Sequence, residues 1–462
     1  MRKTKAALAA IYIMIFAIAV SACGTAKDAP DTPESQASET NGATVTDRED
    51  PEDITGNTAP YTFSEAASET PTEGAEESGT EADSSVSSGK DTVGNETNAP
   101  RETAATGTEG EWSALPQQSS MEQPYWRSKL TADEERVAYD GLSVMVNELS
   151  STAVFARPVS FDRISKAFEF FALDHPEFFW GSGGYTASGS GGAAVSLNVS
   201  GGYTAERLAA MKGEIESVAD AVLATVPAGA DGFVAEKAIF DWLAANVVYD
   251  VSAPDAYSLY GALVGKRCVC EGYAEAFQYL CSRAGVETTS VTGTANNGRT
   301  ADRHKWNAVK LNGDWYYAEP TWAVGAESFK YLYLNESGYI ARSHSPDGGL
   351  AALLPELSAK EMSYLNYYGL NFSDSDFDSV FIKAIDRFKD TMSGGAGTST
   401  VLMRADTPAL AEKYADLISR GGERITELVD SYNARSGSRC RVVGKAGVVY
   451  DSVIFFSVYK TS

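Results

Sequence analysis

Two cysteines stand one residue apart in the stretch KRCVCEGYAEAF, residues 266–277. Apolar residues after Cys270 recur at helical spacing and Gly285 follows where a helix would end, so we expect Cys270 at the start of a helix. Unpaired backbone N–H groups and the helix dipole favour a thiolate there, and the thiolate is the nucleophilic form of cysteine. Cys268 lies in the incoming loop and gains less from the helix end. Cys270 is therefore the candidate nucleophile.

A base for this nucleophile is found on a predicted hairpin. The pair Asn312-Gly313 separates HKWNAVKL from DWYYAEPTW, and Asn-Gly between two such runs is a strong hairpin signal. Counting outward from this loop sets Trp306 opposite Glu319. His304 is then a diagonal neighbour of Glu319, with Cα atoms roughly 7–8 Å apart. A carboxylate at that reach can hydrogen-bond one imidazole nitrogen and leave the other free to act as a base.

The other cysteines of the folded part suggest different roles. Cys281 falls on the apolar stripe of the predicted helix and Cys440 inside a predicted strand, so both are expected to be buried, inert thiols. A redox pair of Cys268 and Cys270 is an alternative, although its usual signature has two residues between the cysteines. Four thiols in so large a segment do not resemble a disulfide scaffold, which is small and rich in cysteine.

Two further histidines are expected to be structural or solvated. His175 precedes Pro176 in a turn, and His344 lies in the polar stretch RSHSPDGG. A zinc site needs clustered ligands at short spacing, and three scattered histidines without a Cys-x-x-Cys pair do not supply them. The sequence therefore predicts no metal site and no cofactor.

Three motifs together resemble the core of the transglutaminase-like superfamily. These are CEGYAEAF, HKWN and AEPTW, in that order. The resemblance covers about residues 205–345 and implies a papain-like fold, in which a helix bearing the cysteine packs on a sheet that carries the histidine and carboxylate. It implies Cys270 as nucleophile, His304 as base and Glu319 as the carboxylate. The family usually has aspartate at the last position, so Glu319 departs from its pattern.

The chemistry implied by this resemblance is acyl transfer through a thioester on Cys270, with protein or peptide, including that of the cell surface, as the substrate. Water as the acceptor makes the protein a peptidase or amidase, and an amine makes it a crosslinking transglutaminase. Hydrolysis is preferred because water needs no second binding site. The alternative is a catalytically inactive module for surface binding or scaffolding, since the family also contains members without a complete triad.

The N-terminal residues 1–23 have the pattern of an export signal. Basic residues precede the apolar run Ala6–Ala22, and the stretch VSAC ends at Cys23. VSAC resembles the lipobox of bacterial lipoproteins, which implies cleavage before Cys23 and lipidation of that residue. An uncleaved single-pass anchor is the alternative. Either way we expect the rest of the chain outside the cytoplasmic membrane and tethered to it.

Residues 24–120 are acidic and poor in apolar side chains. They hold 21 Asp and Glu against 4 Lys and Arg, so we expect a disordered linker that cannot bury enough surface to fold. The remaining residues, 121–462, carry 42 acidic and 31 basic side chains. This negative balance argues against a nucleic-acid partner, which requires a basic surface.

The elements that must position the candidate residues indicate an α+β fold. We expect an N-terminal helical and strand region over 121–204, in which GSGGYTASGSGG is a flexible loop and AAVSLNVS a strand. The catalytic core is predicted over 205–346, with helices near 204–226 and 232–247 ahead of the cysteine motif. Residues 350–462 are predicted to form a small α+β domain of unknown role, with a helix that begins at Thr407-Pro408.

Overall fold

The computed structural model describes residues 52–54, 124–199, 201–326, 329–390, 392, 397–450 and 452–461. The predicted signal segment with Cys23, and all of the acidic segment 24–120 except three residues, lie outside this part of the chain. Those three residues, Glu52–Ile54, form strand β1, which departs from the expected linker without regular structure. None of the helices in the described part is long and apolar enough to cross a membrane.

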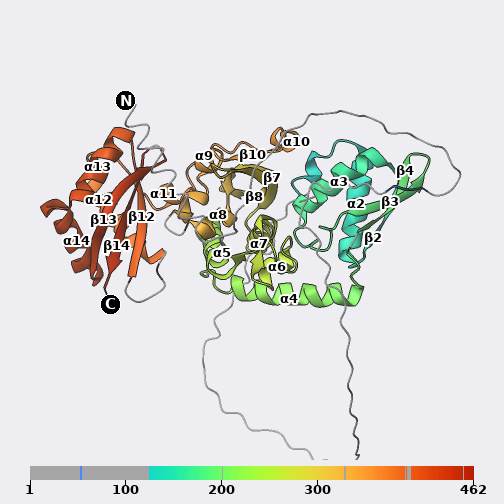
Figure 1. The fold of residues 1–462 in the computed structure, drawn as a ribbon, viewed down its shortest axis with the longest axis horizontal. Helices are drawn as coiled ribbons and strands as arrows, with labels where there is room; N and C mark the ends of the chain where they lie inside the picture. The colour runs from blue at the N-terminus through green and yellow to red at the C-terminus, as the bar shows by residue number, and fades with distance from the viewer. Residues whose placement is uncertain are drawn as a thin grey trace, which may run out of the picture. The chain divides into compact units, whose positions relative to one another are not determined.

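The first region contains a four-stranded sheet in the order β1-β3-β4-β2, with every neighbouring pair antiparallel. Helices α2 and α3 accompany it (Figure 1). The bounds are β2 Thr152–Ser160, β3 Tyr185–Ser190, β4 Ala193–Val199, α2 Asp133–Asn147 and α3 Phe161–Asp174, with a short helical turn at Arg127–Lys129.

Strand β3 corrects the prediction of a flexible loop in GSGGYTASGSGG. Tyr185 and Ala187 alternate into the core while Thr186 and Ser188 are only partly buried, which is the pattern of a half-buried strand. Pairing with β4 and β1 supplies the backbone hydrogen bonds of this segment. Tertiary pairing therefore outweighs the turn preference of its glycines.

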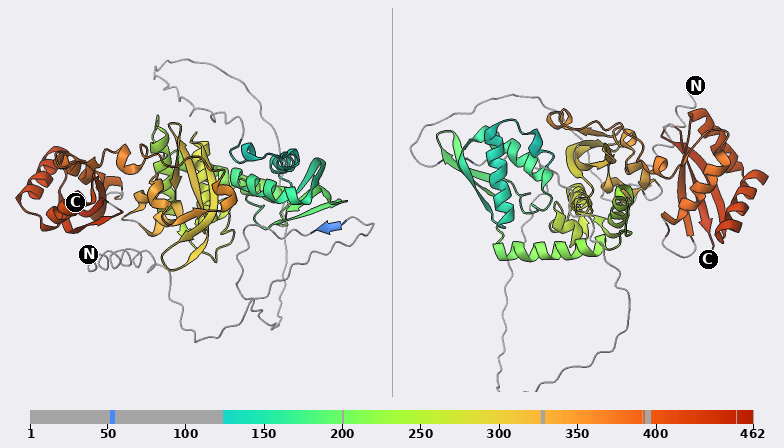
Figure 2. Two further views of the ribbon diagram at one scale, coloured as in Figure 1. Left: turned by 90° about the horizontal axis from the view of Figure 1, so that it is seen from above. Right: turned by 180° about the vertical axis from the view of Figure 1, so that it is seen from behind.

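Four helices lead to and include the cysteine motif. They are α4 Ala205–Leu223, α5 Gly232–Asn246, α6 Leu259–Leu263 and α7 Cys270–Arg283. The first two confirm the predicted helices near 204–226 and 232–247. The side chains of Thr204 and Asp231 cap them by accepting hydrogen bonds from backbone N–H groups three residues later. Figure 2 shows α4 as one long helix.

The sheet behind α7 has the order β10-β7-β8-β9 and is antiparallel throughout. Its strands are β7 Thr288–Asn296, β8 Ala301–Leu311, β9 Asp314–Ala318 and β10 His344–Pro346. A two-stranded parallel sheet, β5 Val248–Tyr249 and β6 Arg267–Cys268, leads into α7. Short helices connect and follow the strands: α8 Pro320–Gly325, η2 Lys330–Tyr333, α9 Ser337–Ile340, α10 Gly348–Ala351 and α11 Tyr364–Tyr367.

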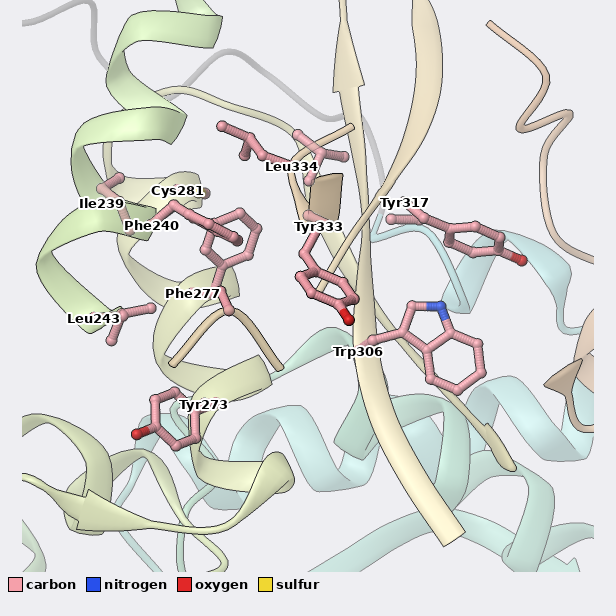
Figure 3. Close-up of a cluster of buried hydrophobic side chains, with 14 of the residues drawn as sticks. Ile239, Phe240, Leu243, Tyr273, Phe277, Cys281, Trp306, Tyr317, Tyr333 and Leu334 are labelled. Atoms are coloured by element: carbon pink, nitrogen blue, oxygen red, sulfur yellow. The ribbon is translucent and has the colours of Figure 1, made fainter. Parts of the chain in front are cut away.

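Aromatic side chains pack between helices α5 and α7 and on both faces of the sheet that contains β8. Figure 3 shows Phe240 of α5 close to Phe277 of α7, and their ring centroids are 6.2 Å apart. Trp306 and Tyr317 lie on the other side of the central strand, with ring centroids 6.0 Å apart. The alternation of side chains along β8 explains the division, because Trp306 shares a face with His304 while Lys305 and Asn307 point the opposite way.

The C-terminal residues form a sheet in the order β11-β12-β14-β13 (Figure 1). The bounds are β11 Asn371–Phe372, β12 Gly397–Ala405, β13 Cys440–Val449, β14 Val453–Lys460, α12 Phe377–Asp386, η3 Arg387–Asp390, α13 Pro408–Arg420 and α14 Glu423–Ser436. Helix α13 begins where predicted, with the Thr407 hydroxyl accepting from the N–H of Leu410. These elements combine helices with one sheet, which is the predicted α+β pattern.

Candidate active site

Cys270 is the first residue of α7, as the sequence predicts. Its side chain is only 7% exposed, so just a small part of it reaches the surface. The preceding residue, Val269, is extended and donates its N–H to the carbonyl of Ala256. This bond and the pairing of β6 with β5 fix the chain as it enters the helix. The thiol is thereby held at the positive end of the helix dipole.

Cys268 occupies a different place in the fold from Cys270. It lies in strand β6 and is fully buried. Burial raises the pKa of the Cys268 thiol well above its usual range, and the neighbouring Cys270 and Glu275 act in the same direction. A buried thiol that stays protonated is a poor nucleophile. The two cysteines are therefore not equivalent.

The hairpin has the register expected from Asn312-Gly313. Leu311 pairs with Asp314, and the pairing continues outward to Asn307 and Ala318. Glu319 follows directly, and its Oε2 lies 2.7 Å from Nε2 of His304. The predicted contact between histidine and carboxylate is thus present.

Glu319 is held by the backbone as well as by His304. It is the N-cap of α8, and its Oε1 accepts hydrogen bonds from the N–H groups of Thr321 at 2.7 Å and Trp322 at 3.1 Å. Proline at the first helical position fits such an N-terminus, because its missing N–H needs no partner there. We call these two backbone hydrogen bonds to Oε1 the clamp. The clamp holds the side chain of Glu319 in place, so Oε2 has little freedom to move although glutamate is one methylene longer than aspartate.

His304 lies between Glu319 and Cys270. Burial by itself lowers the pKa of His304, but the Glu319 carboxylate and hydrogen bonds to Cys270 and Glu319 outweigh burial and raise the pKa to about 10. Burial likewise opposes the charge on Glu319, yet His304 and a hydrogen bond from His344 hold the pKa of Glu319 well below its usual range. Because Nε2 faces Glu319, Nδ1 is the ring nitrogen left to serve Cys270. At neutral pH, His304 is therefore an imidazolium and Glu319 a carboxylate.

His344 joins this site, which the sequence did not predict. It is buried in β10, and its Nε2 lies 3.1 Å from the same Oε2 of Glu319. We expected a structural or solvated histidine in a polar loop. The histidine is not solvated, because the polar stretch contains a strand of three residues that pairs with β7 and buries the ring. The local sequence, in which Ser343, His344 and Ser345 precede a proline, is too weak a signal to identify a strand or a site.

Comparison with known proteins identifies a segment that contains Cys270, His304 and Glu319. Residues 219–320 match the family model of the transglutaminase-like superfamily. The chain contains a transglutaminase-like domain. Cys270, His304 and Glu319 fall within the matched residues of this domain, whereas His344 lies beyond them. Together with the mixed helices and sheet, the match supports the predicted α+β class.

Two curated relatives are similar to a part of this chain in sequence. The Kyphoscoliosis peptidases of Mus musculus and Homo sapiens are each 28% identical to this chain over 29% of its length. The chain spans about a quarter of the length of these relatives, 24% in each case. A solved structure described as "Crystal structure of a TGase" is 15% identical, covers 37% of this chain and 50% of its own, and has a TM-score of 0.21.

The side chains of His304, Glu319 and His344 also lie close enough together to share a metal ion. One atom from each of His304, Glu319 and His344 falls within 4.8 Å of the others. The prediction of scattered histidines therefore fails for two of the three. Both histidine Nε2 atoms have Glu319 as a hydrogen-bond partner, so the shared carboxylate explains why the two rings lie together.

A buried cluster of charged side chains links helix α7 to strand β8, which carries His304. Lys305 lies 2.9 Å from Oε1 of Glu275 and 3.6 Å from Oε1 of Glu271. Burial raises the pKa of both glutamates, against the opposing effect of Lys305. Asn307 adds a hydrogen bond to the carbonyl of Ala274 at 3.0 Å. These contacts fix β8 against α7, and hence His304 relative to Cys270.

The remaining candidate residues have surroundings of their own. His175 ends α3, where it contacts Glu177 at 2.7 Å and the hydroxyl of Tyr139 at 3.0 Å. Cys281 is fully buried in α7, and burial raises its pKa well above the usual range. Cys440 is buried at the start of β13. All four described cysteines, including Cys268 and Cys270, are free thiols.

Proposed function

We propose that this protein is a thiol enzyme that acts on peptide or amide bonds, with Cys270 as nucleophile, His304 as base and acid, and Glu319 as the orienting carboxylate. The observation that carries the proposal is the position of His304, which hydrogen-bonds Glu319 at 2.7 Å and also contacts Cys270. A papain-like arrangement of helix and sheet is part of the same proposal.

The reaction would proceed through a thioester. The Cys270 thiolate attacks the substrate carbonyl carbon, and backbone N–H groups at the start of α7, with that of Cys270 as the first candidate, stabilise the oxyanion. His304 gives its proton to the leaving nitrogen as the C–N bond breaks. Water then attacks the thioester while His304 accepts a proton. The C–S bond breaks, which releases a carboxylic acid and restores the thiolate.

Hydrolysis is proposed over crosslinking. Water needs no second binding site, and the relatives that are 28% identical are named peptidases. The test incubates the protein with a glutamine-containing peptide, with and without a primary amine. Released ammonia with little amine incorporation is expected. Amine incorporation that outpaces hydrolysis would defeat this preference.

The alternative function is an inactive transglutaminase-like module that serves in binding or scaffolding. Labelling with iodoacetamide at neutral pH separates the two. The enzyme is expected to react at Cys270 much faster than a free thiol does, and Cys270→Ala abolishes this reaction while Cys268→Ala leaves it nearly intact. Labelling no faster than a free thiol favours the inactive module, and equal rates at both cysteines would remove Cys270 from its assigned role.

The proposed place of action is outside the cytoplasmic membrane of a bacterium. A lipid on Cys23 is the proposed anchor, and protein or peptide, including that of the cell surface, is the proposed substrate. The motif VSAC ahead of a long acidic segment supports this proposal. Incorporation of labelled fatty acid into the full chain, lost in Cys23→Ala together with membrane association, is the expected result. Membrane association that persists in the Cys23→Ala variant favours the uncleaved anchor.

A further inference from the structure

One oxygen of Glu319 faces two histidines. Its Oε2 lies 2.7 Å from Nε2 of His304 and 3.1 Å from Nε2 of His344. The proposed reaction uses only the first of these contacts. His344 is 2% exposed, comes from a segment outside the family match and lies on a different strand from His304.

The contact to His344 defines where one of its protons lies. An ionised carboxylate only accepts hydrogen bonds, so the Nε2 of His344 must carry a hydrogen to bond with Glu319. The other nitrogen, Nδ1, has two neighbours: the hydroxyl of Ser343 at 3.0 Å and the carbonyl of Ile340 at 3.1 Å. It can accept from the first or donate to the second. In both arrangements the Nε2–H of His344 donates to Oε2.

The sheet is built so that His344 can reach this oxygen. Strand β10 approaches β7 at Gly293, where an added Cβ would lie only 2.1 Å from the carbonyl oxygen of Ser345. On its other side, Gly293 pairs with His304. The His344 ring is flanked by Trp322 and Trp306, with ring centroids 4.6 Å and 5.1 Å away. These contacts hold the imidazole in one orientation.

We propose that His344 is a positioning residue of the thiol site, which shares Glu319 Oε2 with His304 and thereby limits how strongly this carboxylate holds the proton of His304. The proposal rests on the proposed function. With His344, the Glu319 carboxylate accepts four N–H donors, two from backbone and two from imidazoles. Removal of one donor destabilises the carboxylate most when His304 is neutral, because the carboxylate is then least compensated. Without His344, His304 should therefore retain its proton to higher pH.

Other charged groups near the trio remain the same in this comparison. Cys270 of α7 contacts His304 from the helix side. Along β8, Arg303 is paired with Asp347, and Lys305 lies with the two glutamates of α7. No variant used below alters these groups, so a shift in the proton affinity of His304 is assigned to the contact between His344 and Glu319.

The first experiment measures the charge of His304 through two alkylating agents. Iodoacetate is an anion and iodoacetamide is neutral, so the ratio of their rates at Cys270 reports the imidazolium. The ratio should fall with a midpoint near pH 10 in the wild type, following the pKa of His304. His344→Phe keeps a ring but loses the donor, and should move the midpoint up by about one pH unit. His344→Gln retains an N–H donor and should restore the wild-type profile.

The control is His175→Gln, which removes a histidine that contacts a glutamate elsewhere and should leave the profile unchanged. A folded His344→Phe variant with an unshifted midpoint overturns the proposal. So does a His344→Gln variant that is shifted as far as His344→Phe. If the wild type itself shows no fast labelling of Cys270, the proposed function fails instead, which is a distinct outcome.

A second measurement needs no substitution at His344. The chain has three histidines, so the nitrogen resonances of uniformly ¹⁵N-labelled protein can be assigned with two variants: His175→Gln identifies the first ring, His304→Gln the second, and the third belongs to His344. Two-bond ¹H–¹⁵N spectra at pH 7 should show a proton on Nε2 of both His304 and His344. An unprotonated Nε2 on His344 overturns the proposal even if the His344→Phe variant does not fold.

Discussion

Gly272 lies directly against Cys268: a Cβ added at Gly272 would be 2.6 Å from Cβ and 3.0 Å from Sγ of that cysteine. The same Cβ would be 2.9 Å from the carbonyl oxygen of Ser258, at the start of α6. The first turn of α7 therefore packs against β6 and α6 at a distance that only glycine permits. Cys268 is enclosed by this contact, and Cys270 is presented from the same turn.

Gly272→Ala is expected to displace the first turn of α7. The methyl group meets a backbone carbonyl and the backbone-proximal atoms of Cys268, which cannot move away as a flexible side chain would. We expect a loss of stability of about 1–3 kcal/mol, as for other overpacked sites, and a slower reaction of Cys270 with iodoacetamide. Chemical denaturation and labelling rates measure the two effects.

The matched control for this substitution is Gly213→Ala in α4. None of the residues that the structure describes has an atom within 4 Å of the added Cβ there, and alanine is a better helix former than glycine. This variant should be as stable as the wild type or more so, with unchanged labelling. If Gly272→Ala behaves in the same way, the close contact does not position Cys270.

Glu319→Gln is expected to lower turnover by roughly 100-fold or more, since loss of an orienting carboxylate beside a catalytic histidine has large effects. The Gln amide offers one oxygen and one NH₂ group. If the oxygen keeps its hydrogen bonds with Thr321 and Trp322, the NH₂ group faces the N–H groups of both histidines. Steady-state kinetics test this, with Glu319→Asp as the variant that keeps the charge. Unchanged labelling and turnover in Glu319→Gln would exclude Glu319 as the third member.

The pH dependence of stability should carry a signature of His304. Its pKa rises from 6.5 to about 10 on folding, so its contribution to stability is fully present below pH 6.5 and is lost as the pH rises to about 10. Thermal melts of wild type and His304→Gln from pH 6 to 10 measure this contribution. The difference between the two proteins should shrink steadily with pH. A constant difference would contradict the ion pair with Glu319.

Glu236 should make the protein less stable at neutral pH than a glutamine there would. It is fully buried in α5, and burial raises its pKa to about 8 although Asn335 donates a hydrogen bond to Oε2 at 2.7 Å. Within the described part of the chain, its other oxygen, Oε1, has no hydrogen-bond partner. Glu236 therefore contributes stability below pH 4.5 that is lost as the pH rises to about 8.

Replacement of this residue, Glu236→Gln, keeps the shape and removes the charge. We expect a gain of up to about 4 kcal/mol at pH 8, because the pKa rises from 4.5 to about 8 and each unit corresponds to roughly 1.4 kcal/mol, and little change at pH 4. Denaturation at both pH values measures it. An equal effect at the two values would mean that the charge of Glu236 is not responsible.

Local signals predicted the parts of the site that depend on one helix or on one hairpin. The start of α7 at Cys270 follows from helical spacing, and the contact between His304 and Glu319 follows from the Asn312-Gly313 loop, because a two-residue loop fixes the register of both strands. The clamp on Glu319 was missed, although Glu-Pro-Thr-Trp is consistent with an N-cap followed by proline. Strand β3 was missed because turn-forming residues outnumber apolar ones in its sequence.

By itself, the sequence determined which cysteine begins the helix and which carboxylate lies within reach of His304, since both depend on backbone geometry over a few neighbouring residues. Only the tertiary structure decided that His344 belongs beside them. Strand β10 is three residues long and pairs with β7 from far along the chain, at a position where Gly293 leaves room. Such a contact leaves no periodic pattern of apolar residues in the sequence. It is created by the pairing of distant strands and by the packing of Trp306 and Trp322 around the ring of His344.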